Sequence, residues 1–106
     1  MEQRGYNKHE ILGTFHWGET QSPYNYGSYG EIRSTSQLGI SNVTTNFHLY
    51  SLVWSSTELK IYVDNKFLVS LSNSATVPFD NPHYLLLNVA MGGTLGGNIP
   101  GSFDED

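Results

Sequence analysis

The chain has 106 residues and a mass of 11.8 kDa, which suffices for a single domain with one hydrophobic core. Charged residues make up 14% of it and aromatic residues 13%, and the only alanines are Ala75 and Ala90, so a helical bundle is nearly excluded. The net charge of −5 leaves too few basic residues for a nucleic-acid face or for binding to an anionic membrane, and the lack of cysteine excludes disulfides, thiolate zinc sites and thiol nucleophiles.

The first strand is predicted over Glu10 to Trp17 (EILGTFHW), which is rich in β-forming residues and ends at a glycine. Alternation gives this strand two faces, one with Ile11, Gly13, Phe15 and Trp17 and the other with Leu12, Thr14 and His16. A long loop is expected from Gly18 to Gly30, followed by a short strand over Glu31 to Ser34.

A second strand is predicted over Phe47 to Trp54, and a hairpin follows it. The hairpin strands are Thr57 to Val63 and Phe67 to Leu71, on either side of Asp64-Asn65-Lys66. A three-residue turn is preferred here because it aligns Leu59, Ile61 and Val63 with Leu71, Val69 and Phe67, respectively, on one apolar face.

The most apolar segment is His83 to Met91 (HYLLLNVAM), which is too short to cross a bilayer. Both of its faces are apolar apart from His83 and Asn88, a pattern that predicts an inner strand packed on both sides. Turn-rich and glycine-rich segments flank it. Short strands separated by turns indicate an all-β fold, an antiparallel β-sandwich or jelly roll. We expect residues 1–106 to form part of one such domain.

Three segments, in order, carry a resemblance to a known family: 13–17 (GTFHW), 47–54 (FHLYSLVW) running into 62–64 (YVD), and 78–93 (PFDNPHYLLLNVAMGG). Together they resemble the later part of a glycoside hydrolase family 16 domain of the laminarinase (endo-β-1,3-glucanase) type. The resemblance covers nearly the whole chain, and it implies a concanavalin-like jelly roll of which this chain is an internal fragment, about half of the domain.

The resemblance implies a role for Glu2. The catalytic strand of the family has the pattern Glu-x-Asp-x-x-Glu, and Met1-Glu2 stands where that motif ends. Glu2 would then be the general acid/base of a retaining hydrolysis of β-1,3 or mixed β-1,3/1,4 glucan. The nucleophilic Glu and the assisting Asp would precede Met1, so this chain alone is expected to be inactive. Read without the family, Glu2 is a frayed terminal residue.

Three residues are predicted to bind substrate: His16, Trp17 and Asn88. His16 would line the cleft, or is an ordinary histidine on a sheet face. Trp17 would stack on a sugar ring, or packs in the core beside Phe15. Asn88, the one amide inside an apolar strand, must be hydrogen-bonded and either reads a sugar hydroxyl or fixes a loop. Tyr24, Tyr26 and Tyr29 could form a sugar-binding rim or merely cover the core.

No cofactor is expected. The four histidines lie far apart without metal-ligand spacing, and the structural calcium of many family members is held by residues outside this chain. The first residues contain no signal-peptide core, although the resemblance implies an extracellular or periplasmic parent protein. Asn42-Val43-Thr44 matches a glycosylation sequon, a common chance match.

Two alternatives to the hydrolase fragment stay open. One is a non-catalytic carbohydrate-binding module that uses the aromatic face and Asn88. The other is a purely structural β-sheet piece that self-associates through unpaired sheet edges. A β-glucan polysaccharide is the expected partner of the first two.

Overall fold

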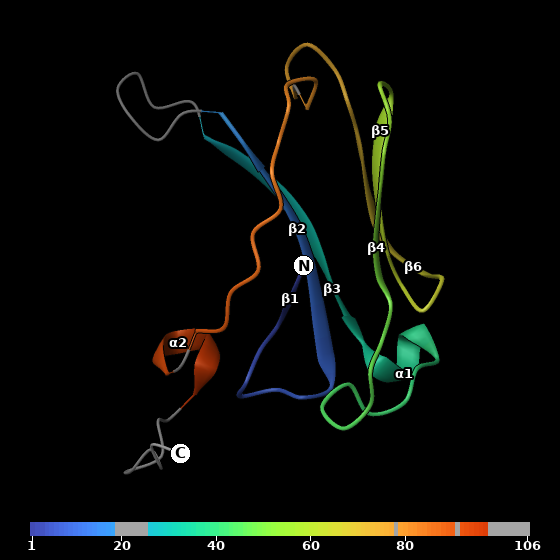
Figure 1. The fold of residues 1–106 in the computed structure, drawn as a ribbon, viewed down its shortest axis with the longest axis vertical. Coiled ribbons are helices and arrows are strands. Elements are labelled where there is room, and N and C mark those ends of the chain that lie inside the picture. The colour runs from blue at the N-terminus through green and yellow to red at the C-terminus, as the bar shows by residue number, and fades with distance from the viewer. Residues whose placement is uncertain (19–25, 78, 91, 98–106) are drawn as a thin grey trace.

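The computed structural model describes residues 1–18, 26–77, 79–90 and 92–97, which form two three-stranded antiparallel sheets (Figure 1). Sheet A contains β1 (Glu2–Gln3), β2 (Glu10–Trp17) and β3 (Gly27–Ser34), and sheet B contains β4 (Tyr50–Trp54), β5 (Glu58–Val63) and β6 (Lys66–Ser72). Each sheet has its strands in chain order. The predicted all-β antiparallel architecture is therefore confirmed.

Strand β2 has the predicted bounds, and its alternation is also as predicted. Ile11, Gly13 and Phe15 are buried, while Leu12 and Thr14 are only partly buried. Strand β3 is longer than predicted, because β2 pairs with it over its full length from Glu10↔Ser34 to Trp17↔Gly27. The strand pairing thus extends to Gly27, whereas the glycine-rich composition of this part of the sequence had predicted a loop up to Gly30. The remainder of that predicted loop, residues 19–25, lies outside the described residues.

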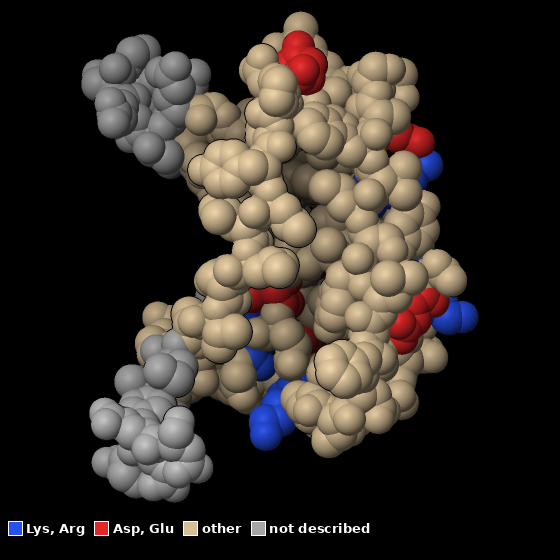
Figure 2. All heavy atoms as spheres, in the orientation of Figure 1, with Lys and Arg blue, Asp and Glu red and all other residues tan. Residues whose placement is uncertain are grey.

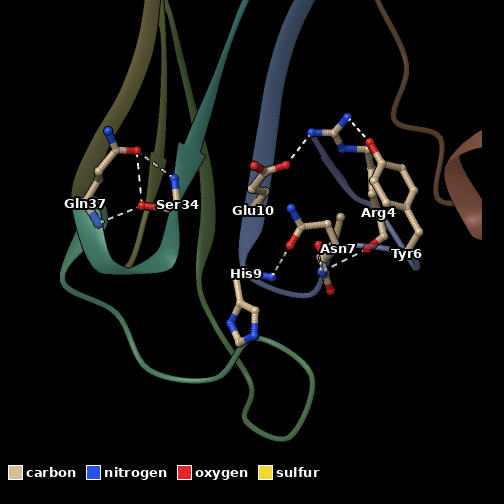
Figure 3. A network of polar contacts seen from close by, with 8 residues as sticks. Arg4, Tyr6, Asn7, His9, Glu10, Ser34 and Gln37 are labelled. Atoms are coloured by element: carbon tan, nitrogen blue, oxygen red, sulfur yellow. Dashed lines mark hydrogen bonds and ion pairs between the residues drawn. The ribbon is translucent and has the colours of Figure 1, made fainter.

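Two single-turn helices, α1 (Thr35–Leu38) and α2 (Gly93–Gly96), lie outside the sheets. The side chains of Ser34 and Gln37 form a reciprocal capping box at the start of α1, and Gly39 ends it with φ 62° (Figure 3). Leu38 thereby enters the core. Within the residues that the structure describes, no helix is long and apolar enough to span a membrane.

The hairpin of sheet B turns through two residues, so the predicted three-residue turn is wrong. Val63 pairs with Lys66, and Asp64 and Asn65 both have positive φ, 48° and 62°. A register shift after Ile61 then places Ile61 opposite Val69 and Leu59 opposite Leu71, as predicted. The irregularity in the ladder restores the predicted alignment for these two pairs, but the third predicted pair is wrong, because Phe67 lies opposite Tyr62 and not Val63.

The core lies between β2 and the β5–β6 hairpin. Its buried side chains are Ile11, Phe15, Leu38, Leu59, Ile61, Val63, Leu68 and Val69. Gly13 lets the two sheets approach each other. A Cβ atom added there would lie 2.5 Å from Leu68 Cδ2 and 2.8 Å from Val69 Cγ1, well inside normal contact.

The sandwich is incomplete on the β4 side. Tyr50, Leu52 and Trp54 pair with the buried residues Val63, Ile61 and Leu59, so they project toward the core side of sheet B. They nevertheless remain 40%, 51% and 42% exposed. Sheet A covers the hairpin and leaves this part of sheet B open.

The prediction of an inner strand over His83 to Met91 is not met in the structure. Residues 83–90 have no strand partner among the described residues, and Met91 lies outside them. The large apolar side chains of this segment are 74–93% exposed: Tyr84, Leu85, Leu86, Leu87 and Val89. A buried strand needs neighbours on its edges and faces, and the described part of this chain supplies none here.

Candidate functional site

One face of sheet A carries two of the residues that the sequence singled out, Glu2 and His16. Glu2 pairs with Leu12, and cross-strand partners project to the same side of a sheet. Alternation along β2 adds Thr14 and His16 to this side. We call it the outer face of sheet A, formed by Glu2, Glu10, Leu12, Thr14 and His16, with Ser28, Gly30 and Ile32 of β3.

Glu2 is exposed and lies in a strand that has only one neighbour, β2. The other edge of β1 is free within the described sheet. The ladder fixes the side of the sheet from which the carboxylate projects, even though β1 has only two residues. Glu2 and His16 therefore share a face, while nothing in the geometry tests the catalytic role assigned to Glu2.

A polar network anchors the turn that follows Glu2 (Figure 3). Arg4 Nη2 lies 2.5 Å from Glu10 Oε2, and Arg4 Nη1 donates to the Tyr6 hydroxyl. The Arg4 guanidinium also lies 5.0 Å from the centroid of the Tyr6 ring. This charge-assisted contact joins the chain after β1 to the start of β2 and so supports the register at Glu2.

Sequence reasoning missed Arg4 and Glu10. The available signal was an Arg and a Glu on either side of a short turn between two paired segments. The Arg4 side chain is 12% exposed and that of Glu10 is 31% exposed, so the pair is substantially shielded from water. It belongs to the support of the outer face.

His16 is exposed on the outer face and contacts the next segment of the chain. Its Nδ1 is hydrogen-bonded to the Tyr26 hydroxyl, and the two rings stack with centroids 5.6 Å apart and planes at 25°. Tyr26 therefore lies beside His16, and its part in a sugar-binding rim stays a prediction. Tyr29 pairs with Phe15 and belongs to the opposite face, and Tyr24 lies outside the described residues.

Trp17 lies on the core side of sheet A and not beside His16. Its ring covers Gly27, where an added Cβ would lie 2.5 Å from the indole Cε2. It also meets the Phe79 ring edge-on, with centroids 6.4 Å apart. The ring is only partly buried. This is the position expected from the core alternative for Trp17, and its role in substrate binding stays a prediction.

Asn88 is exposed in the unpaired segment 83–90, so the buried amide that the sequence predicts is not found. The segment leads to α2, which lies beside the turn after β1. A Cβ on Gly5 would be 2.5 Å from the Gly96 carbonyl oxygen. The chain beyond Asn88 thus returns to the Glu2 end of sheet A (Figure 1), while the structure does not bring Asn88 itself into contact with His16.

The described surface carries few charges. In Figure 2 most of the visible face is neither basic nor acidic, and the charged side chains lie in small separate groups. Among the described residues, no three His, Asp or Glu side chains are grouped so that they could hold a metal ion. The outer face offers the carboxylate of Glu2, which forms no ion pair with a described residue, the imidazole of His16 and the hydroxyls of Thr14 and Ser28.

The chain matches a known protein family. The family model described as "Glycosyl hydrolases family 16" matches residues 2–104 of the chain. The chain belongs to this family.

The relatives support the same placement. A "Glucan endo-1,3-beta-glucosidase A1" from Niallia circulans is 35% identical over 98% of this chain and 16% of its own length. A "Beta-1,3-glucan-binding protein" from Penaeus monodon is 27% identical over 91% of this chain and 33% of its own length. The family 16 chain therefore resembles both a named hydrolase and a named binding protein.

A solved structure has the same arrangement. LamAcat from Zobellia galactanivorans matches with a TM-score of 0.78 and 40% identity, over 95% of this chain and 38% of that one. A variant of that protein, in complex with laminaritriose and laminaritetraose, matches equally well. The chain thus spans 16–38% of these relatives, which agrees with the incomplete sandwich.

Proposed function

We propose that this chain is part of the catalytic domain of a retaining endo-β-glucanase that hydrolyses β-1,3 or mixed β-1,3/1,4 glucan, with Glu2 as the general acid/base. The observation that carries the proposal is the register Glu2↔Leu12, which puts Glu2 on the same face as Thr14 and His16. The named activity of the Niallia relative and the laminarioligosaccharide complex of the solved relative support a β-glucan as substrate.

Retaining hydrolysis needs two carboxyl groups about 5–5.5 Å apart. One attacks the anomeric carbon, and the other protonates the leaving oxygen and then activates water. Glu10 is the second carboxylate on the outer face, but Arg4 binds it at 2.5 Å, so it is committed to an ion pair. Glu2 has no such cation partner among the residues that the structure describes, and it therefore fits the proton-transfer role better. The attacking carboxylate would come from outside these 106 residues, and for this reason we propose that the isolated chain is inactive.

His16 would hydrogen-bond the sugar or the reacting carboxylates from its place on the outer face. We retain Trp17 and Asn88 as proposed substrate-binding residues on the resemblance alone. For Trp17 this requires a ligand at the strand end, where its partly exposed ring meets Phe79. We also propose an extracellular or periplasmic location for the parent protein.

A carbohydrate-binding module is the second candidate, because one relative is named a glucan-binding protein. Measuring reducing ends released from laminarin, together with binding of laminarin to the chain, tests both proposals. The fragment proposal predicts no turnover by the isolated chain. Turnover that is lost in Glu2→Gln and kept in the control Glu31→Gln would overturn the claim of inactivity while supporting the role of Glu2. Glu31 is a suitable control because it pairs with Gly13 and so belongs to the other face.

Binding without turnover fits both candidates, and its loss in His16→Ala or in Trp17→Ala locates the ligand. The first result would place the ligand on the outer face and the second at the Trp17 edge. Glu2→Gln should leave such binding unchanged, since a binding module needs no proton donor.

A further inference from the structure

A histidine that the proposed function does not use lies at the junction of the two sheets. Residues 39–49 connect α1, at the end of sheet A, to β4 of sheet B. His48, near the end of this connection, has a side chain that is only 5% exposed. It lies against the two-residue turn between β5 and β6, which contains Asp64.

Both ring nitrogens of His48 face acceptors. Nδ1 lies 2.6 Å from Asp64 Oδ2, and Nε2 lies 3.2 Å from the carbonyl oxygen of Asn42. A carbonyl oxygen can only accept a hydrogen bond, and so can an ionised carboxylate. Both contacts are satisfied together only if both ring nitrogens carry a proton, which makes the ring an imidazolium.

The Asp64 carboxylate has a second contact to the same segment. Its Oδ1 accepts from the backbone N–H of Leu49 at 2.9 Å, and the backbone N–H of Asp64 donates to the Leu49 carbonyl, also at 2.9 Å. Through His48, the carboxylate is thus tied indirectly to Asn42. The turn of one hairpin thereby holds both ends of the segment from Asn42 to Leu49.

We propose that His48, Asp64 and the Asn42 carbonyl form a protonation-dependent clamp that fastens the connection 39–49 to the β5–β6 turn. The clamp is closed when His48 is an imidazolium and Asp64 is a carboxylate. Loss of the His48 proton leaves one N–H for two acceptors. The shorter, charge-assisted contact to Asp64 keeps that proton, and the contact to Asn42 opens. Protonation of Asp64 instead weakens the contacts to both His48 and Leu49.

The surrounding charges agree with this arrangement. The hydrogen bond to Asp64 raises the pKa of His48 above 6.5, and the bond to the Asn42 carbonyl adds to the effect. The bond to His48 lowers the pKa of Asp64 below 3.8, with a further contribution from the Leu49 N–H. Segment 39–49 has no other ionisable side chain. Tyr50 in β4 directly follows this segment, and Lys66 in β6 is two residues from Asp64. Burial and then the Asp64 charge raise the pKa of Tyr50, so this tyrosine is neutral throughout the range in which the clamp acts.

Nitrogen-15 NMR of the imidazole rings tests the clamp in the full chain. We expect His48 to hold protons on both nitrogens at a pH where the same ring, in the urea-unfolded chain, is already neutral. As the pH rises further, the protection of the Thr44 amide, which donates to Asn42 Oδ1, should fall before the protection of amides in β5 does, once the rates are corrected for the intrinsic pH dependence of exchange. A His48 titration at the same or a lower pH in the native sample than in urea would refute the clamp, whether or not any variant folds.

Two substitutions sharpen the test. Asp64→Asn keeps a residue that tolerates the positive φ of this turn but removes the charge, and it should lower the titration midpoint of His48 toward that of the unfolded chain. The control Asp80→Asn removes an exposed carboxylate outside the cluster and should leave the midpoint unchanged. Equal midpoints in the native chain and in Asp64→Asn would also overturn the proposal.

Discussion

The substitution Gly13→Ala tests the close approach of the two sheets. Its added Cβ would lie 2.5 Å from Leu68 Cδ2, 2.8 Å from Val69 Cγ1 and 3.2 Å from Ile61 Cδ1. Normal carbon–carbon contacts are about 3.5–4.0 Å, so two methyl groups must move by about 1 Å in a packed core. Overpacking of this kind costs about 1–3 kcal/mol, and the gain from replacing a strand glycine returns about 0.5–1 kcal/mol. We expect the free energy of unfolding to fall by about 1–2 kcal/mol, measured by urea unfolding followed by circular dichroism.

A double-mutant cycle with Leu68→Ala identifies the cause. Leu68→Ala removes the atom nearest to the new Cβ and leaves a cavity that this Cβ can fill. In that background Gly13→Ala should cost little or should stabilise the chain. Leu59→Ala is the control, since Leu59 is equally buried and is not among the nearest neighbours of the Gly13 position. An equal cost of Gly13→Ala in all backgrounds would refute the reasoning.

Three further results are expected. Gly27→Ala places a Cβ 2.5 Å from the Trp17 ring, so in a Trp54→Phe background the emission of Trp17 should shift to longer wavelength; an unchanged spectrum would contradict the contact. Leu87 is 87% exposed, so light scattering should detect self-association of the chain that Leu87→Lys reduces and Asn81→Lys does not; a monomeric native chain would contradict this. The raised pKa of His48 contributes to the stability of the folded chain, and this contribution is lost as the pH rises above 6.5 through the pKa of His48 in the folded chain. The lowered pKa of Asp64 also contributes to stability, and this contribution is lost as the pH falls below 3.8 through the pKa of Asp64 in the folded chain. The stability difference between the native chain and Asp64→Asn should therefore be largest between these limits, and a pH-independent difference would contradict it.

Strand β2 could be predicted to the residue because one face of it is buried and the other is not. Ile11, Gly13 and Phe15 pack on the hairpin, so the residues that face the core alternate with residues that do not, and this alternation is visible in the sequence. The same logic predicted the pairing of Ile61 with Val69 and of Leu59 with Leu71. It could not predict the turn, because a short turn with an irregular ladder and a long turn with a regular one align these residues equally well.

The segment 83–91 shows the opposite limit of sequence reasoning. Its apolar composition on both faces is that of a strand with neighbours on every side, and this composition is a property of the whole domain. The chain corresponds to 38% of the solved relative, and the described part of it offers no such neighbours. The prediction of a buried Asn88 was wrong for the same reason, since no neighbouring strand of the described residues packs against this amide.

Glu2 could be placed because its position depends on local contacts alone. Only the family resemblance indicated a catalytic acid at this position, since a single glutamate near a chain end has no pattern of its own. The structure adds that Glu2 pairs with Leu12, and this pairing determines the face of the sheet from which the Glu2 side chain projects. Trp17 could not be assigned in this way, because adjacent residues of a strand project to opposite faces and its neighbour His16 takes the outer one.

The open core and the ordered outer face have a common physical explanation. Burial against a second sheet is a long-range requirement, and without the remainder of the domain it fails at Tyr50, Leu52 and Trp54. The register of β1 is a short-range property that needs only β2 and the Arg4–Glu10 contact across one turn. A part of this fold can therefore keep the geometry on which Glu2 depends while it lacks the core that would make the domain complete. The outer face and the core should for this reason respond to different substitutions, with Glu10→Gln disturbing the outer face and Gly13→Ala disturbing the core.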